Sequence, residues 1–220
     1  MSVTPESVQA LIDSSDFGDR IRGINQLRQL DPKIAFEMIQ PLVSDQNVRV
    51  RYAAVSQLDP LGKQDLEKAL ELLRERLRFD PEADVKAVAA DVIGGLKLTA
   101  AFEDLQQLYH QTSEWLIQMS IIACLGEFGD PRGFDLLKIA LQNENSLVAT
   151  AAISALGELG DSRAIELLLP FINDPDWQVR YRLVQAFGNL EGEQAKTALE
   201  QLSGDPVEQV AVAAQTLLSH

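Results

Sequence analysis

The chain has 220 residues, with 19 Lys and Arg against 33 Asp and Glu, so its formal net charge is −14. This charge argues against broad binding to the phosphate backbone of nucleic acids, which depends on clustered cations. The single cysteine excludes an internal disulfide, and the sequence contains neither a signal peptide nor an apolar stretch that could span a membrane. We therefore expect a soluble cytoplasmic protein.

A short pattern recurs along the chain and predicts repeated pairs of helices, called A and B here. In chain order, the B helices are anchored at Val50, Val85, Ile117, Val148, Val179 and Val210, which are 35, 32, 31, 31 and 31 residues apart. A period of this length is typical of stacked repeats. The segment 21–30 is a seventh, less regular copy.

The A helices precede the B helices and carry the same helical spacing of apolar residues. They include the segments 32–43, 64–77, 133–141 and 164–172. The 35-residue spacing before Val85 predicts a longer A helix over 64–77. Pro41 and Pro170 occupy the same place in two A helices, nine residues before their anchors, and predict a shared kink.

Proline and glycine mark the predicted turns. Six prolines follow aspartate, and an Asp at the N-cap with Pro at the first helical position starts a helix; these pairs are at 31–32, 59–60, 80–81, 130–131, 174–175 and 205–206. Glycine at nine residues after the anchor predicts the end of the B helix in four repeats, at Gly94, Gly126, Gly157 and Gly188.

Paired helices, a proline inside A and Val-Arg at the start of B resemble HEAT repeats. The resemblance covers nearly the whole chain and implies an all-α solenoid, a right-handed superhelical crescent of six to seven helix pairs. No linker or low-complexity stretch interrupts it, so we expect a single domain over 1–220. Such arrays support many functions, so the architecture does not specify one.

The direction of the B-helix side chains predicts a binding surface. If positions 0, +3, +4, +7 and +8 from the anchor face the core, then −2, +2, +5, +6 and +9 face the concave side of the array. Both tryptophans, two of the three tyrosines and one methionine fall on that side: Tyr52, Trp115, Met119, Trp177 and Tyr181. Burial in the core is the competing interpretation of aromatic residues at helical spacing, but other residues already fill the core stripe.

The arginines of the B helices have two interpretations. Arg22, Arg51, Lys86 and Arg180 all lie at +1, which suggests a ladder that joins each repeat to aspartates in the turns, or a set of cations for an acidic ligand. Arg182 lies at +3, where other repeats have small residues. We expect it to meet a carboxylate of the neighbouring repeat or, as the alternative, an anion in the groove.

Candidates for chemistry are few. Asp91 at +6 and Glu114 beside Trp115 are carboxylates expected in the groove, and neither has a paired acid or base in the sequence. No metal-ligand spacing, phosphate-binding loop or nucleophile motif is present, so we expect no metal and no bound cofactor.

Four longer segments resemble the phycobilisome degradation proteins of cyanobacteria, a family related to the E/F-type phycobilin lyases. They are 1–32, 42–58, 112–137 and 174–190, and they include "SEWLIQMSIIACLGEFGDPRG" and "DPDWQVRYRLVQAFGNL". The resemblance implies a protein associated with phycobilisomes that binds phycobiliprotein subunits such as phycocyanin and allophycocyanin. The lyase relatives attach or remove a thioether-linked bilin at a cysteine of the partner and commonly work as a pair of chains. This chain is therefore either self-sufficient or homodimeric.

The resemblance implies a ligand that suits the predicted surface. A bilin is a flat π-system with two propionates, which the aromatic residues and Arg51, Arg180 or Arg182 would bind. Cleavage of the thioether also needs proton transfer, for which Asp91 and Glu114 are the candidates. Two functions remain open: a lyase-like enzyme that detaches the chromophore, and a non-catalytic adaptor that binds phycobilisomes and recruits other degradation factors.

Overall fold

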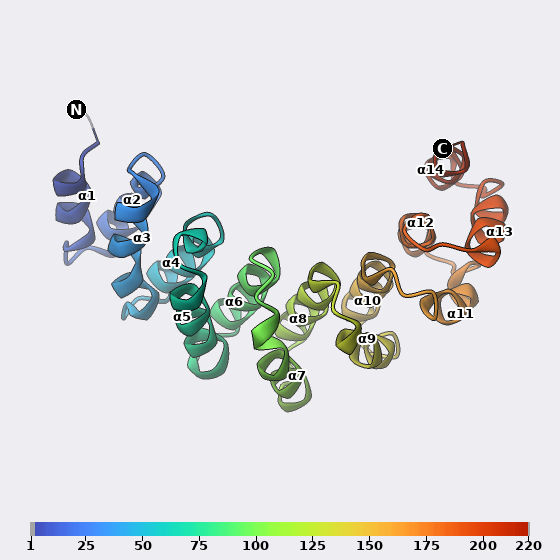
Figure 1. Cartoon of the computed structure of the whole chain (residues 1–220), viewed down its shortest axis with the longest axis horizontal. Helices are drawn as coiled ribbons and strands as arrows, with labels where there is room; N and C mark the ends of the chain where they lie inside the picture. The colour runs from blue at the N-terminus through green and yellow to red at the C-terminus, as the bar shows by residue number, and fades with distance from the viewer. Residues whose placement is uncertain (1–2, 220) are drawn as a thin grey trace. The chain divides into compact units, whose positions relative to one another are not determined.

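The computed structural model describes residues 3–219, and within that range it consists of helices joined by short turns, with no strand (Figure 1). The all-helical prediction is confirmed. The α-helices are α1 Pro5–Ile12, α2 Phe17–Leu27, α3 Pro32–Ile39, α4 Val48–Leu61, α5 Leu66–Phe79, α6 Ala83–Gly95, α7 Phe102–Gln111, α8 Trp115–Phe128, α9 Phe134–Ala140, α10 Ser146–Leu159, α11 Ala164–Leu168, α12 Trp177–Gly188, α13 Glu193–Leu202 and α14 Glu208–Leu218. Five short 3₁₀ helices lie between them: η1 Gln40–Ser44, η2 Gly62–Gln64, η3 Thr99–Ala101, η4 Pro131–Gly133 and η5 Leu169–Phe171.

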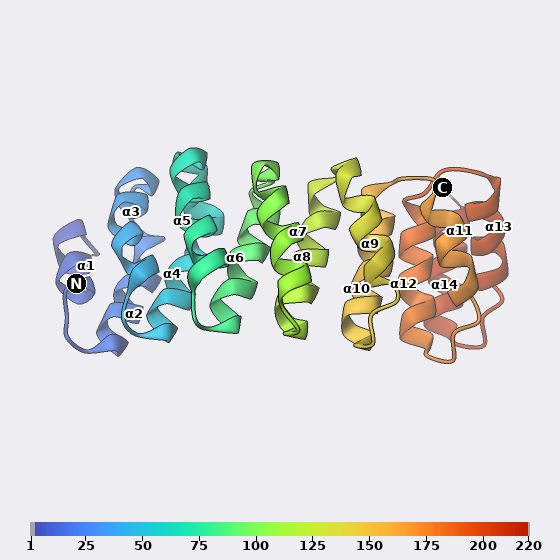
Figure 2. The same cartoon turned by 90° about the horizontal axis from the view of Figure 1, so that it is seen from below.

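The chain folds as two compact units, one ending at Ile121 and the other beginning at Ile122, within α8. In the first unit the B helices α2, α4 and α6 pack in sequence, and α3 and α5 pack against α4 and α6. In the second unit α10, α12 and α14 form one layer (Figures 1 and 2). Helix α9 packs on α10, α11 packs on α10 while η5 contacts α12, and α13 packs on both α12 and α14. No helix within residues 3–219 is long and apolar enough to cross a membrane.

The B helices bury a wider face than the apolar stripe predicts. Positions 0, +4 and +8 are buried as expected, except that Val179 at 0 and Leu218 at +8 are half-buried. The residues at +5 were predicted to face the groove, and they are also buried: Val55, Ala90, Ile122, Ile153 and Val184. The prediction is wrong there because B helices also pack on neighbouring B helices, as α4 does on α6 and α10 does on α12. In α10, α12 and α14, position +3 instead lies at the edge of the buried face, and Ala151, Arg182 and Ala213 are half-buried or exposed. In α6 and α8 the residues at +3, Val88 and Ser120, are buried.

The glycines at +9 lie inside the last turns of the B helices, not after them, and their role is close packing. A Cβ atom at Gly126 would lie 2.7 Å from Ala155 Cα, and one at Gly157 would lie 2.5 Å from Ala186 Cα. Distances this short are incompatible with a side chain, so glycine permits the backbones of successive B helices to approach. The residue that ends α10 is Gly160, which has a φ of 70°. The helix α10 therefore ends at Gly160 and not at Gly157, the residue predicted from position +9.

The Asp-Pro pairs lie in three different settings, of which only one is a helix start. Asp31 caps α3 and Asp130 caps η4, as predicted. Asp80, Asp174 and Asp205 lie instead in the turn before a B helix, where each carboxylate accepts a hydrogen bond from the backbone N–H two residues later. Asp59-Pro60 is a third case, because Pro60 lies within α4 and starts no helix.

The remaining predictions about the A helices agree with the structure. At Pro41 and Pro170 the α-helix gives way to 3₁₀ geometry, in η1 and η5, because proline cannot donate the hydrogen bond that would continue the helix. The segment before Val85 forms α5, which has 14 residues and is longer than the A helices α3, α7, α9, α11 and α13.

Forked ion pairs join each of three B helices to the turn of the next repeat. Arg20, Arg51 and Arg180 direct Nε and Nη2 at the two carboxylate oxygens of Asp45, Asp80 and Asp205, at 2.6 to 3.0 Å. In each case Nη1 donates to a carbonyl oxygen of the arginine's own turn. The predicted ladder is therefore present, with Arg20 in place of Arg22, whose exposed side chain pairs with Asp19 on its own helix. The first copy of the repeat is thus shifted by two residues from the sequence alignment.

Arg180→Ala should lower the free energy of unfolding by about 1 to 3 kcal/mol, because it leaves the nearly buried Asp205 carboxylate without its partner. The hydrogen bonds from Arg180 hold the pKa of Asp205 below its usual range. The stabilisation is therefore complete above pH ~4 and is lost as the pH falls through the lowered pKa. Chemical denaturation at pH 7 and pH 3 measures both effects. Arg22→Ala is the matched control, and an equal loss in the two variants would contradict a structural ladder.

Gly157→Ala should also destabilise the protein, by about 1 to 3 kcal/mol, because the new methyl group meets the backbone of α12. Gly204→Ala provides the comparison, since its Cβ would lie 3.6 Å from the nearest atom, an ordinary contact. Thermal unfolding of both variants tests the packing role. A melting temperature for Gly157→Ala at or above that of the wild type would show that the B helices tolerate a wider spacing.

Candidate functional site

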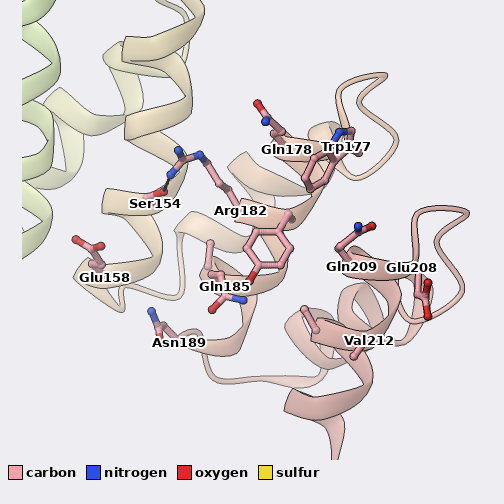
Figure 3. A pocket seen from close by; sticks show the side chains of 13 residues that line it. Ser154, Glu158, Trp177, Gln178, Arg182, Gln185, Asn189, Glu208, Gln209 and Val212 are labelled. Carbon is pink, nitrogen blue, oxygen red and sulfur yellow. Dashed lines mark hydrogen bonds between the residues drawn. The ribbon is translucent and has the colours of Figure 1, made fainter.

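A groove lies on the exposed side of three successive B helices of the second unit. It has a volume of about 1000 Å³ and is formed by the exposed faces of α10, α12 and α14. Figure 3 shows its side chains in place. The lining residues are Ser154, Glu158, Trp177, Gln178, Tyr181, Arg182, Gln185, Ala186, Asn189, Glu208, Gln209, Val212 and Ala213. We call this surface the C-terminal groove.

Three of the predicted site residues meet in this groove. Trp177 and Tyr181 are one helical turn apart on α12 and expose 40% and 38% of their surface, so neither belongs to the core. Asp176 caps α12 and accepts a hydrogen bond from the backbone N–H of Gln178, which fixes the first turn that carries Trp177. Arg182 follows on the same helix and extends toward α10 (Figure 3).

Arg182 meets a hydroxyl group and not the carboxylate predicted for it. Its Nη1 donates to Ser154 Oγ at 3.3 Å, and among the described residues it forms no ion pair. The prediction is wrong because +3 lies at the edge of the buried face, where a long side chain reaches solvent. The guanidinium therefore retains donors that face the groove, and it is available for an anionic group of a ligand.

Arg51 and Arg180, predicted both as ladder residues and as ligand-binding residues, have their guanidinium groups directed at aspartates. Arg51 is buried against Asp80, and Arg180 is held by Asp205 and the carbonyl oxygen of Asp174. Their fork geometry is the strong, bidentate form of the interaction. These contacts favour the ladder role over the ligand role for both residues.

The other predicted site residues lie in the first unit, which is described by itself. Tyr52 on α4 and Trp115 on α8 expose 46% and 41% of their surface, and Met119 is half-buried. Glu114 is exposed just before α8. Loss of hydration raises the pKa of Asp91, although a hydrogen bond with the Ser120 hydroxyl opposes this shift.

The groove is also lined by polar residues that were not named as site candidates from the sequence, although Gln185 at +6 and Glu208 at −2 occupy positions predicted to face it. Four carboxamides, Gln178, Gln185, Asn189 and Gln209, line it together with two carboxylates, Glu158 and Glu208. Glu158 and Asn189 both lie ten residues after their anchors, a position that was not considered for this surface. Its angle of about 280° from the anchor places it on the exposed side, so the helical rotation itself could have found them.

The groove combines four chemical properties. Two aromatic side chains offer flat apolar contact, Arg182 offers a cation, the carboxamides offer paired donors and acceptors, and Glu158 offers a carboxyl group whose pKa is raised by burial. A flat, partly apolar ligand with carboxylates and amide-like edges would satisfy all of them. Within residues 3–219, no group of three His, Cys, Asp or Glu side chains is arranged to hold a metal ion.

Arg182→Ala should change the free energy of unfolding by no more than about 0.5 kcal/mol, because the side chain loses only one exposed hydrogen bond. Denaturation beside Arg180→Ala, two residues earlier on α12, tests the difference between the two arginines. A loss as large as that of Arg180→Ala would instead place Arg182 in the structural ladder.

The comparisons with known proteins identify the repeat. A family model described as HEAT repeats matches residues 4–94, 70–155 and 135–218. The comparison with curated protein sequences gave no significant match.

Among solved structures, the chain is similar to one from the complex of CpcE and CpcF of phycocyanin lyase from Nostoc sp. PCC7120. The TM-score is 0.65 and the identity 22%, over 100% of this chain and 95% of that one. It is also similar to the Escherichia coli protein YibA, with TM-score 0.64, 14% identity and coverage of 99% and 93%. An archaeal HEAT-like repeat protein from Thermococcus onnurineus NA1 follows, with TM-score 0.61, 13% identity and coverage of 100% and 97%. At these identities the structural matches establish a shared fold. Because the family model covers nearly the whole chain, this protein belongs to the HEAT-repeat family.

Proposed function

We propose that this protein is a phycobilin lyase-like factor that binds phycobiliproteins through the C-terminal groove and promotes detachment of their thioether-linked bilin during phycobilisome degradation. The observation that carries the proposal is the meeting of Trp177, Tyr181 and Arg182 in one groove. The fold similarity to a chain of a phycocyanin lyase complex supports it, because a related scaffold acts on such a chromophore.

The chemistry of a bilin matches the groove. Its conjugated rings are flat and apolar, which suits stacking on Trp177 and Tyr181. Its propionates are anions, and Arg182 is the groove cation whose carboxylate partner is missing among the described residues. The end rings are lactams, each with an N–H donor and a carbonyl acceptor, and a carboxamide offers the complementary pair. The protein as a whole has a net charge of −14, so Arg182 places a positive charge in the groove of an otherwise acidic protein.

The direct test is to mix the purified protein with phycocyanin, and separately with allophycocyanin, and follow chromophore absorbance and covalent attachment to the subunit. A catalyst present at one-tenth of the substrate concentration should release more than one equivalent of bilin. Release limited to one equivalent would instead favour an adaptor that acts stoichiometrically. The absence of both release and binding would overturn the proposal.

Trp177→Ala should weaken binding of free phycocyanobilin by about 2 kcal/mol, roughly thirty-fold in Kd, because a large aromatic anchor is removed from the groove. Trp115→Ala is the matched control: Trp115 occupies the same position relative to its anchor and is equally exposed, but it does not line the groove. Titration followed by bilin absorbance measures both variants. Equal weakening would mean that the ligand also contacts the first unit, and unchanged binding in both would exclude the aromatic residues from the site.

A further inference from the structure

The C-terminal groove holds a carboxylate in an unusual setting. Of its lining residues only Arg182, Glu158 and Glu208 carry a formal charge, and they come from three different helices. Glu158 lies on the last turn of α10, below Ser154 and Arg182 in the view of Figure 3, and Asn189, the residue that follows α12, lies below it in the same view.

The glycine of the preceding B helix makes room for the Glu158 carboxylate. A Cβ atom placed on Gly126 would lie 2.7 Å from Glu158 Oε2, so the oxygen rests against the bare backbone of α8. This contact removes water from one side of the carboxylate, and the loss of hydration raises its pKa. The carboxylate is therefore a stronger base than a fully hydrated glutamate, while its other side remains open to the groove.

We propose that Glu158 is the proton-transfer residue of the groove, which removes a proton from the bilin adduct and returns it to the departing sulfur. This inference rests on the proposed function, and it replaces Asp91 and Glu114 as the candidates for that role. Asp91 shares a hydrogen bond with Ser120, and both Asp91 and Glu114 lie in the first unit, outside the lining of the C-terminal groove. Glu158 is the candidate that lines the same groove as Trp177, Tyr181 and Arg182.

The step is an elimination and needs no oxidant or reductant. The Glu158 carboxylate takes the proton from the carbon adjacent to the C–S carbon, and the electrons of that C–H bond form a new C=C bond. The C–S electrons leave with sulfur as a thiolate, which then takes the proton from the Glu158 carboxylic acid. The products are a free cysteine on the phycobiliprotein and a bilin with one more double bond, and Glu158 is restored to its starting state.

The position of Arg182 supports this assignment, because Arg182 lies on α12 and donates a hydrogen bond to Ser154 of α10, the helix that carries Glu158. An anionic propionate held by Arg182 would anchor the bilin next to α10, the helix that carries Glu158. Glu208 lines the opposite wall on α14, and the Tyr181 hydroxyl is the remaining titratable group of the lining. Only Glu158 of these groups lies on α10.

Glu158→Gln tests the proposal, because glutamine keeps the shape and polarity of the side chain but cannot take a proton. The variant should bind free phycocyanobilin as tightly as the wild type and melt at the same temperature, while release from phycocyanin slows by about 10² to 10⁴-fold. Glu158→Asp should restore part of the rate. Glu200→Gln, an exposed acid on α13 away from the groove, is the control and should release bilin at the wild-type rate.

The outcomes separate this inference from the proposed function. A wild-type rate in Glu158→Gln would overturn the proton-transfer role and leave the proposed function in place. A slow rate with equally weakened bilin binding would also overturn it, because Glu158 would then hold the ligand. A wild-type protein that neither binds nor releases bilin would overturn both. Intact binding with slow release, partly restored by aspartate, is the result that the proposal requires.

Discussion

The close approach of successive B helices is the constraint on which the rest of the second unit depends. Where Gly126 faces Ala155 and Gly157 faces Ala186, the glycine has no Cβ atom, so the backbones of α8 and α10, and of α10 and α12, approach directly at these points. This spacing lets one exposed face continue across neighbouring helices. Side chains from α10, α12 and α14 therefore share a single groove, although the anchors of neighbouring B helices are 31 residues apart in the sequence.

The same packing explains why two arginines on one helix differ in role. Arg180 points toward the next repeat, where Asp205 completes a fork, and Arg182 points back toward α10, where its Nη1 donates to the Ser154 hydroxyl. The first guanidinium is neutralised in a nearly buried contact, and the second remains a cation on an open surface. A charge without a carboxylate partner beside two exposed aromatics is the feature that distinguishes a binding surface from a solvated helix face.

The architecture could be predicted from the sequence because the 31-residue period and the apolar spacing of the B helices are local signals, and the exposure of Trp177 and Tyr181 followed from the same rotation. The predictions were wrong for residues whose burial or partners depend on a second helix. The +5 residues such as Val184 are buried by packing between repeats, and Arg20 replaces Arg22 because the first repeat is irregular. The setting of Glu158 depends on Gly126, 32 residues earlier. The periodic pattern marks this glycine, but it does not show that the glycine contacts a side chain of the next B helix.

The Asp205 carboxylate has two partners, and this has a consequence for how the repeats assemble. One of its oxygens accepts the backbone N–H of Val207, which shapes the turn before α14, while both receive the guanidinium of Arg180 from the previous repeat. The Asp205 side chain therefore both shapes the turn of its own repeat and attaches that repeat to the preceding one. In a linear array, such sharing strengthens nearest-neighbour coupling relative to the intrinsic stability of each repeat. We therefore expect α12 and α14 to fold together, so that the groove formed by their exposed faces is gained or lost as one unit.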